Sequence, residues 1–255
     1  MLRRDRLSRS RAARGRPPRS LWTIVVTCAL AAGLYSALAA PVQGADTHVP
    51  RGGAGYFMIG GALPDLGALN GALERGGYSR FPRSFFTMGG GGHAFIGRLI
   101  LGGEGQTLLE RGRTSAGRES VLSGGCGFFN VGYAVHSGDG LEVFPLIGVG
   151  AGSLNLKIAG RDPVSFEDVL GDPGRSARLQ KSGFLMQAAL AADRWLRSGR
   201  GNGRGGLFIG IRAGYVFAPA GGAWELEGLE AEGGPKAGWS GPYIRISIGA
   251  GHRAQ

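Results

Sequence analysis

Glycine breaks up the stretches of this chain that otherwise read as β-strands. Residues 84–107 read SFFTMGGGGHAFIGRLILGGEGQT, and glycine supplies 51 of the 255 residues. Glycine inside a strand normally weakens it, because it adds backbone entropy and no side chain. The glycines follow no three-residue period and stand among Leu, Ile, Phe and Tyr, which argues against a collagen-like chain and against a disordered linker. The fold must therefore be one whose strands need small residues on one face.

Eight segments are predicted to be strands, and most of them have about ten or more residues. They lie within residues 55–62, 85–98, 99–110, 118–137, 141–158, 183–197, 206–220 and 241–251. Strands of soluble proteins usually have about 5–6 residues, whereas a tilted strand that crosses a membrane has about 9–11. The lengths therefore favour strands that span a membrane.

The connections between these segments are predicted to alternate in length. Those after the first, third, fifth and seventh strands are the longer ones, and a tight turn at 97–98 is one of the short ones. The first long connection is predicted to hold a short helix over 65–75, with Asp65 at its start and the glycines at 76–77 at its end. Alternating short turns and long loops are typical of an up-and-down antiparallel transmembrane β-barrel of about eight strands.

The last two predicted strands each have an apolar face and a face that combines polar residues with glycine. In residues 241–251 the two faces are Ile244, Ile246, Ile248 and Ala250 against Tyr243, Arg245, Ser247, Gly249 and Gly251. In residues 206–220, Arg212 alternates in the same way with leucine and isoleucine. A face with arginine beside glycine is a poor soluble core, but it suits the narrow polar lumen of an eight-stranded barrel. The glycines are then expected to make space inside the barrel.

Three charged residues are candidates for a polar network in this lumen: Glu104, Arg212 and Arg245. The two arginines lie on neighbouring predicted strands and repel each other unless acidic groups lie close. Glu104 is the best-placed acidic residue on a strand, although it must reach across the lumen. We therefore predict a contact between Glu104 and the arginines that plugs the lumen; a selective pore or a ligand site is the alternative.

The N-terminal residues 1–44 are predicted to be an export signal. Eight arginines and one aspartate in residues 1–20 give +7 of the net charge of +11, and the apolar segment 21–40 follows. A basic region followed by an apolar stretch and small residues is typical of a secretory signal; an uncleaved membrane anchor is the alternative reading. A short linker, 45–54, then precedes a barrel domain over 55–255. Because most of the positive charge belongs to this signal, nucleic acid is not an expected partner.

Aromatic residues gather near the ends of the predicted strands, which is typical of the aromatic girdles of membrane barrels. The residues concerned are Tyr56, Phe57, Phe85, Phe86, Tyr133, Phe144, Trp195, Tyr215, Phe217, Trp239 and Tyr243. Aromatic residues are also common in strands of any kind, so this pattern alone does not decide the fold.

No motif indicates catalysis, a cofactor or a metal. The segment GVGAG at 148–152 lacks a following helix and the rest of a dinucleotide fingerprint. The four histidines are scattered without ligand spacing, and Cys126 has no C-x-x-C mate. An enzyme is therefore not expected.

Several stretches together resemble the glycine-rich outer-membrane β-barrel proteins of diderm bacteria. They are GYFMIGG, FFTMGGGGHAFIGRLILGGEG, GGLFIGIRAGYVFAP and GPYIRISIGAG, and the resemblance covers most of residues 55–251. It implies a barrel in the outer membrane, with outer-membrane lipid and the barrel-insertion machinery as partners and an extracellular ligand of unknown identity. Many such barrels end in an aromatic residue, whereas this chain ends HRAQ.

Three classes of function fit these expectations. The first is a structural or surface-binding outer-membrane protein with a plugged lumen. The second is a small pore or transporter for small solutes, which eight strands disfavour. The third is an outer-membrane enzyme that modifies lipid, which would need a catalytic constellation near one rim.

Overall fold

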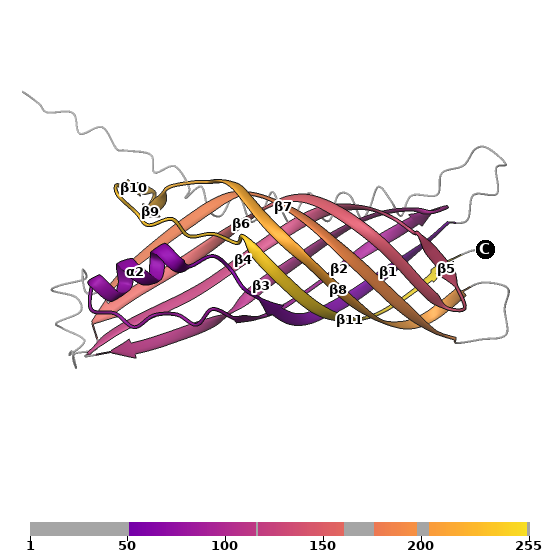
Figure 1. Cartoon of the computed structure of the whole chain (residues 1–255), viewed down its shortest axis with the longest axis horizontal. Helices are drawn as coiled ribbons and strands as arrows, with labels where there is room; N and C mark the ends of the chain where they lie inside the picture. Colours follow the sequence, from indigo (N-terminus) through magenta and orange to yellow (C-terminus); the bar gives the residue numbers. More distant parts are fainter. Residues whose placement is uncertain (1–50, 116, 161–175, 198–203, 254–255) are drawn as a thin grey trace, which may run out of the picture. The chain divides into compact units, whose positions relative to one another are not determined.

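The computed structural model describes residues 51–115, 117–160, 176–197 and 204–253 (Figure 1). All of them belong to the second of two compact units of the chain, Pro41–Gln255. The predicted export signal and most of the predicted linker therefore lie outside the described residues. Within the described part of the chain, no helix is long and apolar enough to cross a membrane.

Eight long strands close into an antiparallel barrel, which confirms the predicted fold. The long strands are β1 (Arg51–Ala62), β2 (Phe85–Ile96), β3 (Leu99–Ser115), β4 (Arg118–Tyr133), β6 (Leu141–Gly160), β7 (Ser176–Arg197), β8 (Arg204–Gly221) and β11 (Gly241–Arg253). Each pairs with the next along the chain, and β11 pairs with β1. Three short strands lie in the connections: β5 (His136–Gly138), β9 (Trp224–Leu226) and β10 (Leu229–Ala231).

The barrel wall has an apolar outer face and a mixed inner face. On β11, Ile246 is 51% exposed whereas its neighbour Arg245 is 2% exposed. The same alternation holds along β8 and confirms the predicted faces. It also holds on β4, where Phe128 points inward and is buried and the next residue, Phe129, points outward.

Several strands are longer than predicted, because the backbone ladder continues where the apolar alternation has ended. β7 has 22 residues and begins at Ser176, although its first seven residues were expected to be a polar loop. β1 begins at Arg51, four residues early. β3 runs to Ser115, so only residues 116 and 117 separate it from β4. The long loop expected after the third strand is therefore not formed: Ser115 pairs with Arg118, and Gly117 has a φ of +74°.

The helix α2 (Gly67–Arg75) lies in the first connection, as predicted, and packs over one end of the lumen (Figure 1). Leu69 and Leu73 are buried against residues of the barrel wall such as Leu108. The N-cap position is Leu66 rather than Asp65, although the Asp65 carboxylate accepts a hydrogen bond from Gly67 N–H at 3.2 Å. The helix ends at Arg75, and Gly76 caps its C-terminus, as expected.

The prediction of an aromatic girdle is only partly correct. Five of the eleven aromatic residues point outward: Phe57, Phe86, Tyr133, Tyr215 and Phe217. The other six are buried: Tyr56, Phe85, Phe144, Trp195, Trp239 and Tyr243. Adjacent residues on a strand point to opposite faces, so pairs such as 56–57 and 85–86 contribute one ring to each face.

Candidate functional site

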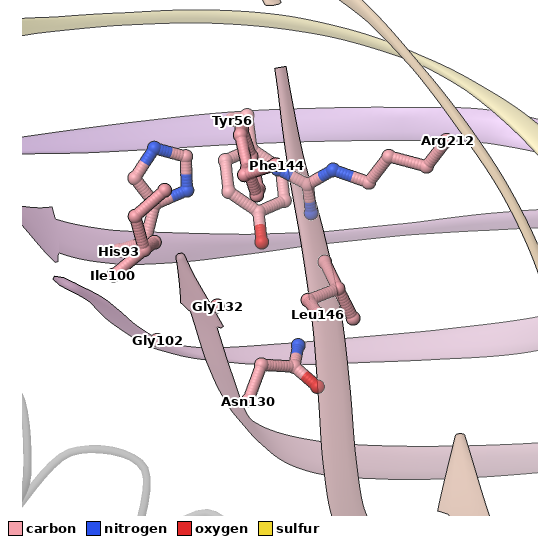
Figure 2. A pocket seen from close by; sticks show the side chains of 9 residues that line it. All are labelled: Tyr56, His93, Ile100, Gly102, Asn130, Gly132, Phe144, Leu146 and Arg212. Atoms are coloured by element: carbon pink, nitrogen blue, oxygen red, sulfur yellow. The ribbon is translucent and has the colours of Figure 1, made fainter. Parts of the chain in front are cut away.

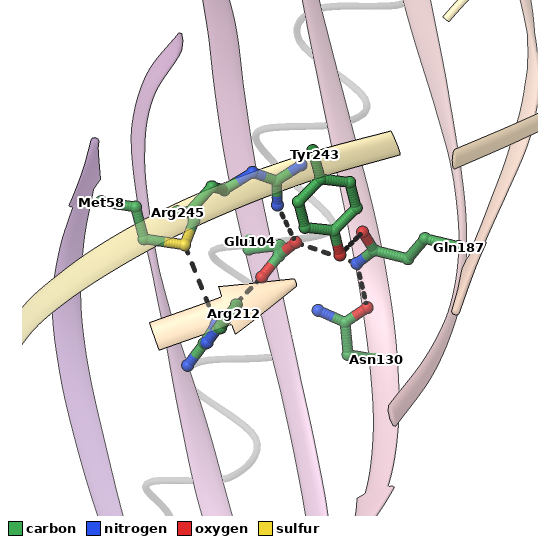
Figure 3. A network of polar contacts seen from close by, with 7 residues as sticks. All are labelled: Met58, Glu104, Asn130, Gln187, Arg212, Tyr243 and Arg245. Carbon is green, nitrogen blue, oxygen red and sulfur yellow. Dashed lines mark hydrogen bonds and ion pairs between the residues drawn. The ribbon is translucent and has the colours of Figure 1, made fainter. Parts of the chain in front are cut away.

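Glu104 lies between Arg212 and Arg245 in the middle of the lumen (Figure 3). One Glu104 carboxylate oxygen is 3.0 Å from Arg212 Nη1, and the other is 3.0 Å from Arg245 Nη1. At most 2% of each side chain is exposed. The structure thus brings together the three residues that the sequence singled out, from β3, β8 and β11.

The strand register explains why the two arginines need this carboxylate. Arg212 and Arg245 lie directly opposite each other on β8 and β11. Like charges in that position destabilise a sheet, and a buried charge without a partner is costly. Because Glu104 gives one oxygen to each guanidinium, a single acidic residue contacts both arginines.

Two tyrosine rings support the guanidinium groups from the side. The Arg212 guanidinium carbon lies 3.9 Å from the centre of the Tyr56 ring, and that of Arg245 lies 3.5 Å from the centre of the Tyr243 ring. A cation over an aromatic face is attracted by the ring's electron density, and the attraction is stronger where water is excluded. The rings therefore hold the arginines in place and fill the lumen around them.

An amide and a hydroxyl group extend the network. The Gln187 amide donates to Glu104 Oε1 at 2.9 Å and to Asn130 Oδ1 at 2.7 Å, and it accepts a hydrogen bond from the Tyr243 hydroxyl at 2.9 Å. The sequence analysis did not assign Gln187, Asn130 or Tyr243 to the network. Their inward positions on the strands were the available signal.

A second acidic residue lies on the inner face near the arginines. Asp193 on β7 is fully buried and interacts electrostatically with Arg212. Sequence reasoning missed Asp193. With Glu104, it brings the formal charge of the two arginines and two acids to zero, which reduces the cost of burying them.

Glycines on the inner face leave the space that these side chains occupy. A Cβ atom on Gly91 would lie 2.8 Å from the Tyr56 hydroxyl and 2.9 Å from Glu104 Cβ. A Cβ atom on Gly60 would lie 2.7 Å from Arg245 Cα. These distances are shorter than real Cβ contacts, so the network needs glycine at both positions.

The space left in this part of the lumen is small (Figure 2). A cavity of about 10 Å³ lies between Tyr56, His93, Asn130 and Arg212. This volume is about enough to hold one water molecule. It is far smaller than the pockets of several hundred Å³ that bind small molecules.

Other candidate groups are dispersed. Cys126 is a buried free thiol on the inner face of β4, and His93 packs at the edge of the Phe95 ring. Among residues 51–253 that the structure describes, no three His, Cys, Asp or Glu side chains gather as a metal site would require.

The closed eight-stranded antiparallel barrel, with its apolar outer face and polar filled interior, is the architecture of a small outer-membrane β-barrel. No family of known proteins matches the sequence, and no curated protein matches it. The chain is similar in structure to Ail, the attachment invasion locus protein of Yersinia pestis, solved with the heparin analogue sucrose octasulfate. That comparison has a TM-score of 0.40 and 10% identity, and covers 80% of this chain and 99% of Ail. Neisserial surface protein A is also similar, with a TM-score of 0.34, 9% identity, and coverage of 80% of this chain and 96% of that one.

Proposed function

We propose that this protein is an outer-membrane barrel with a structural or surface-binding role, and that its lumen is closed to solutes. The observation that carries this proposal is the buried bridge from Glu104 to Arg212 and Arg245. Because the three side chains meet across the lumen, they occupy the path that a solute would take. A small pore, the alternative, would require this bridge to open.

The outer face supports the proposed location in a membrane. Large apolar side chains stand exposed on every long strand, and examples are Ile147, Leu190, Leu207 and Ile248. Monomeric soluble proteins rarely expose a continuous apolar surface of this kind. We propose that residues 1–44 export the chain, that the linker is limited to residues 45–50 because β1 begins at Arg51, and that the barrel-insertion machinery places the barrel in the outer membrane.

The end of the barrel with α2 supports a role outside the cell. There α2, the ends of β3 and β4, and the β9–β10 hairpin lie together (Figure 1). Arg111 and Arg113 are exposed on β3, and Glu225 and Glu230 lie opposite each other on the hairpin. We propose that this end meets the extracellular side and carries the surface on which the protein acts.

Conductance in a planar lipid bilayer tests the closed lumen. The parent protein is expected to conduct poorly, and Glu104→Ala is expected to leak because it removes the bridge. Glu110→Ala is the matched control, since Glu110 is an exposed carboxylate on the same strand. A steady, large conductance of the parent would reject the plug and favour the pore.

A further inference from the structure

The strands β6 and β7 continue beyond the apolar band as a ladder of polar side chains on the outer face. Three successive pairs lie directly opposite each other: Ser153 with Ser182, Asn155 with Gln180, and Lys157 with Arg178. These residues alternate with Leu154 and Leu156 on β6, which are buried inside. The six side chains therefore point outward, away from the lumen.

On the side of this ladder away from α2, the outer face of the same two strands is apolar. Ile147 and Val149 on β6 and Phe184 and Met186 on β7 are all exposed large hydrophobic residues. Moving toward the end with α2, the outer face thus changes from apolar residues to neutral hydrogen-bonding residues and then to two cations. A molecule that fits this order has acyl chains, a polar uncharged part and an anionic group in sequence.

The two cations at the end of the ladder nearest α2 repel each other. Lys157 and Arg178 are exposed and directly opposite, and like charges in that position destabilise a sheet. Within the described residues, neither cation lies within ion-pairing distance of a carboxylate. Glu119 and Glu225 flank the ladder one strand away on each side, opposite Ala159 and Gln180. An anion between Lys157 and Arg178 would relieve the repulsion.

We propose that this ladder is a binding site for a phosphorylated glycolipid of the outer leaflet. Lys157 and Arg178 bind a phosphate group, because arginine forms paired hydrogen bonds with phosphate oxygens and lysine supplies a point charge. Asn155 and Gln180 hydrogen-bond to sugar hydroxyls. The acyl chains lie along the apolar band below. The inference rests on the proposed location in the outer membrane, with the α2 end outside.

Binding of lipopolysaccharide to the purified full-length protein in detergent micelles tests the site. The parent is expected to retain lipopolysaccharide. The double variant Lys157→Gln/Arg178→Gln is expected to bind it about 30-fold more weakly, because each of the two cations contributes a similar part of the free energy of binding to the lipid. Arg194→Gln is the matched control, because Arg194 is an exposed outward cation at the other end of β7. This control is expected to bind like the parent.

Two further probes identify the chemistry. Lipopolysaccharide from which the phosphates have been removed is expected to bind the parent as weakly as the intact glycolipid binds the double variant. Phosphatidylglycerol is expected to bind more weakly than lipopolysaccharide, because it offers a phosphate but no sugar. Equal binding of lipopolysaccharide by the parent and the double variant would overturn the proposal, and so would binding of either other lipid to the parent as tightly as intact lipopolysaccharide. The assay does not depend on conductance, so it can fail while the closed lumen stands, or succeed if the lumen conducts.

Discussion

The inner and outer faces of the barrel wall both contain many glycines, but packing requires glycine mainly on the inner face. On the inner face, a Cβ atom on Gly89 would lie 2.7 Å from Gln106 Cα, and one on Gly91 would meet Tyr56 and Glu104. On the outer face, a Cβ atom on Gly103 or Gly105 would meet its nearest atom only at 3.7 or 3.9 Å.

This difference separates two uses of the same residue. Inside, glycine makes room for a plug of large polar and aromatic side chains in a narrow barrel. Outside, glycines on β1, β3 and β4 leave the wall flat where side chains would fit. Gly90 on β2 is an exception, since its Cβ would lie 2.9 Å from Tyr56 O. The inner face is therefore expected to be far less tolerant of substitution than the outer face.

The largest effect is expected from removal of the buried carboxylate. Glu104→Ala leaves Arg212 and Arg245 buried opposite each other and should lower the free energy of unfolding by about 3–5 kcal/mol. Urea unfolding in lipid vesicles measures this change. Glu110→Ala, at the exposed carboxylate of the same strand, should change it by less than about 0.5 kcal/mol. If the two variants unfolded at the same urea concentration, the network would contribute nothing to stability.

A charge on the outer face should have the next largest effect. Ile246→Arg places a cation on the lipid side near the middle of β11 and should cost about 2–4 kcal/mol. His252→Arg, on the same outer face six residues further along β11, should cost at most about 1 kcal/mol, because it lies near the interface. Unfolding midpoints in vesicles compare the two. An unchanged midpoint for Ile246→Arg would show that this face does not meet lipid.

Adding one methyl group to each face tests the contrast between the glycines directly. Gly91→Ala should cost about 1–3 kcal/mol, because the methyl group overlaps Tyr56 and Glu104. Gly103→Ala on the neighbouring strand should be neutral or stabilise by up to about 1 kcal/mol, because alanine restricts the unfolded chain more than glycine does. Equal costs for both variants would refute the distinction between the faces.

The smallest effect concerns a lysine on the inner face beyond the apolar band. Burial beside Trp224 lowers the pKa of Lys181 below its usual 10.5, so its charged form is disfavoured in the folded state. Lys181→Met should therefore be slightly more stable than the parent at neutral pH. The difference should shrink as the pH rises from the lowered pKa through 10.5, since the lysine is then neutral in both states. Thermal unfolding at several pH values measures it; a difference that grows with pH would contradict this account.

The sequence was sufficient for the parts of the structure that depend on strand periodicity. Alternation along each strand placed Arg212, Arg245 and Glu104 on the inner face and Ile246 on the outer face. The strand order was predictable because neighbours in the chain pair in an up-and-down barrel. These features need only local information.

The remaining features depend on information that a single strand does not carry. The partners Gln187 and Asn130 could not be assigned, because the stagger of the closed barrel decides which residues of distant strands meet at one level. The polar start of β7 was taken for a loop, because the backbone pairing that makes it a strand leaves no mark on an exposed, polar segment. The outer glycines, such as Gly103, were attributed to the lumen because composition does not distinguish the two faces.

The central claim is that the apolar outer face lies in the outer membrane around a filled lumen. Fractionation of cells that produce the full-length chain tests it most directly. The account predicts that the protein sediments with the outer membrane on a density gradient and is released only by detergent. Recovery of the folded protein from the soluble periplasmic fraction, without detergent, would contradict it.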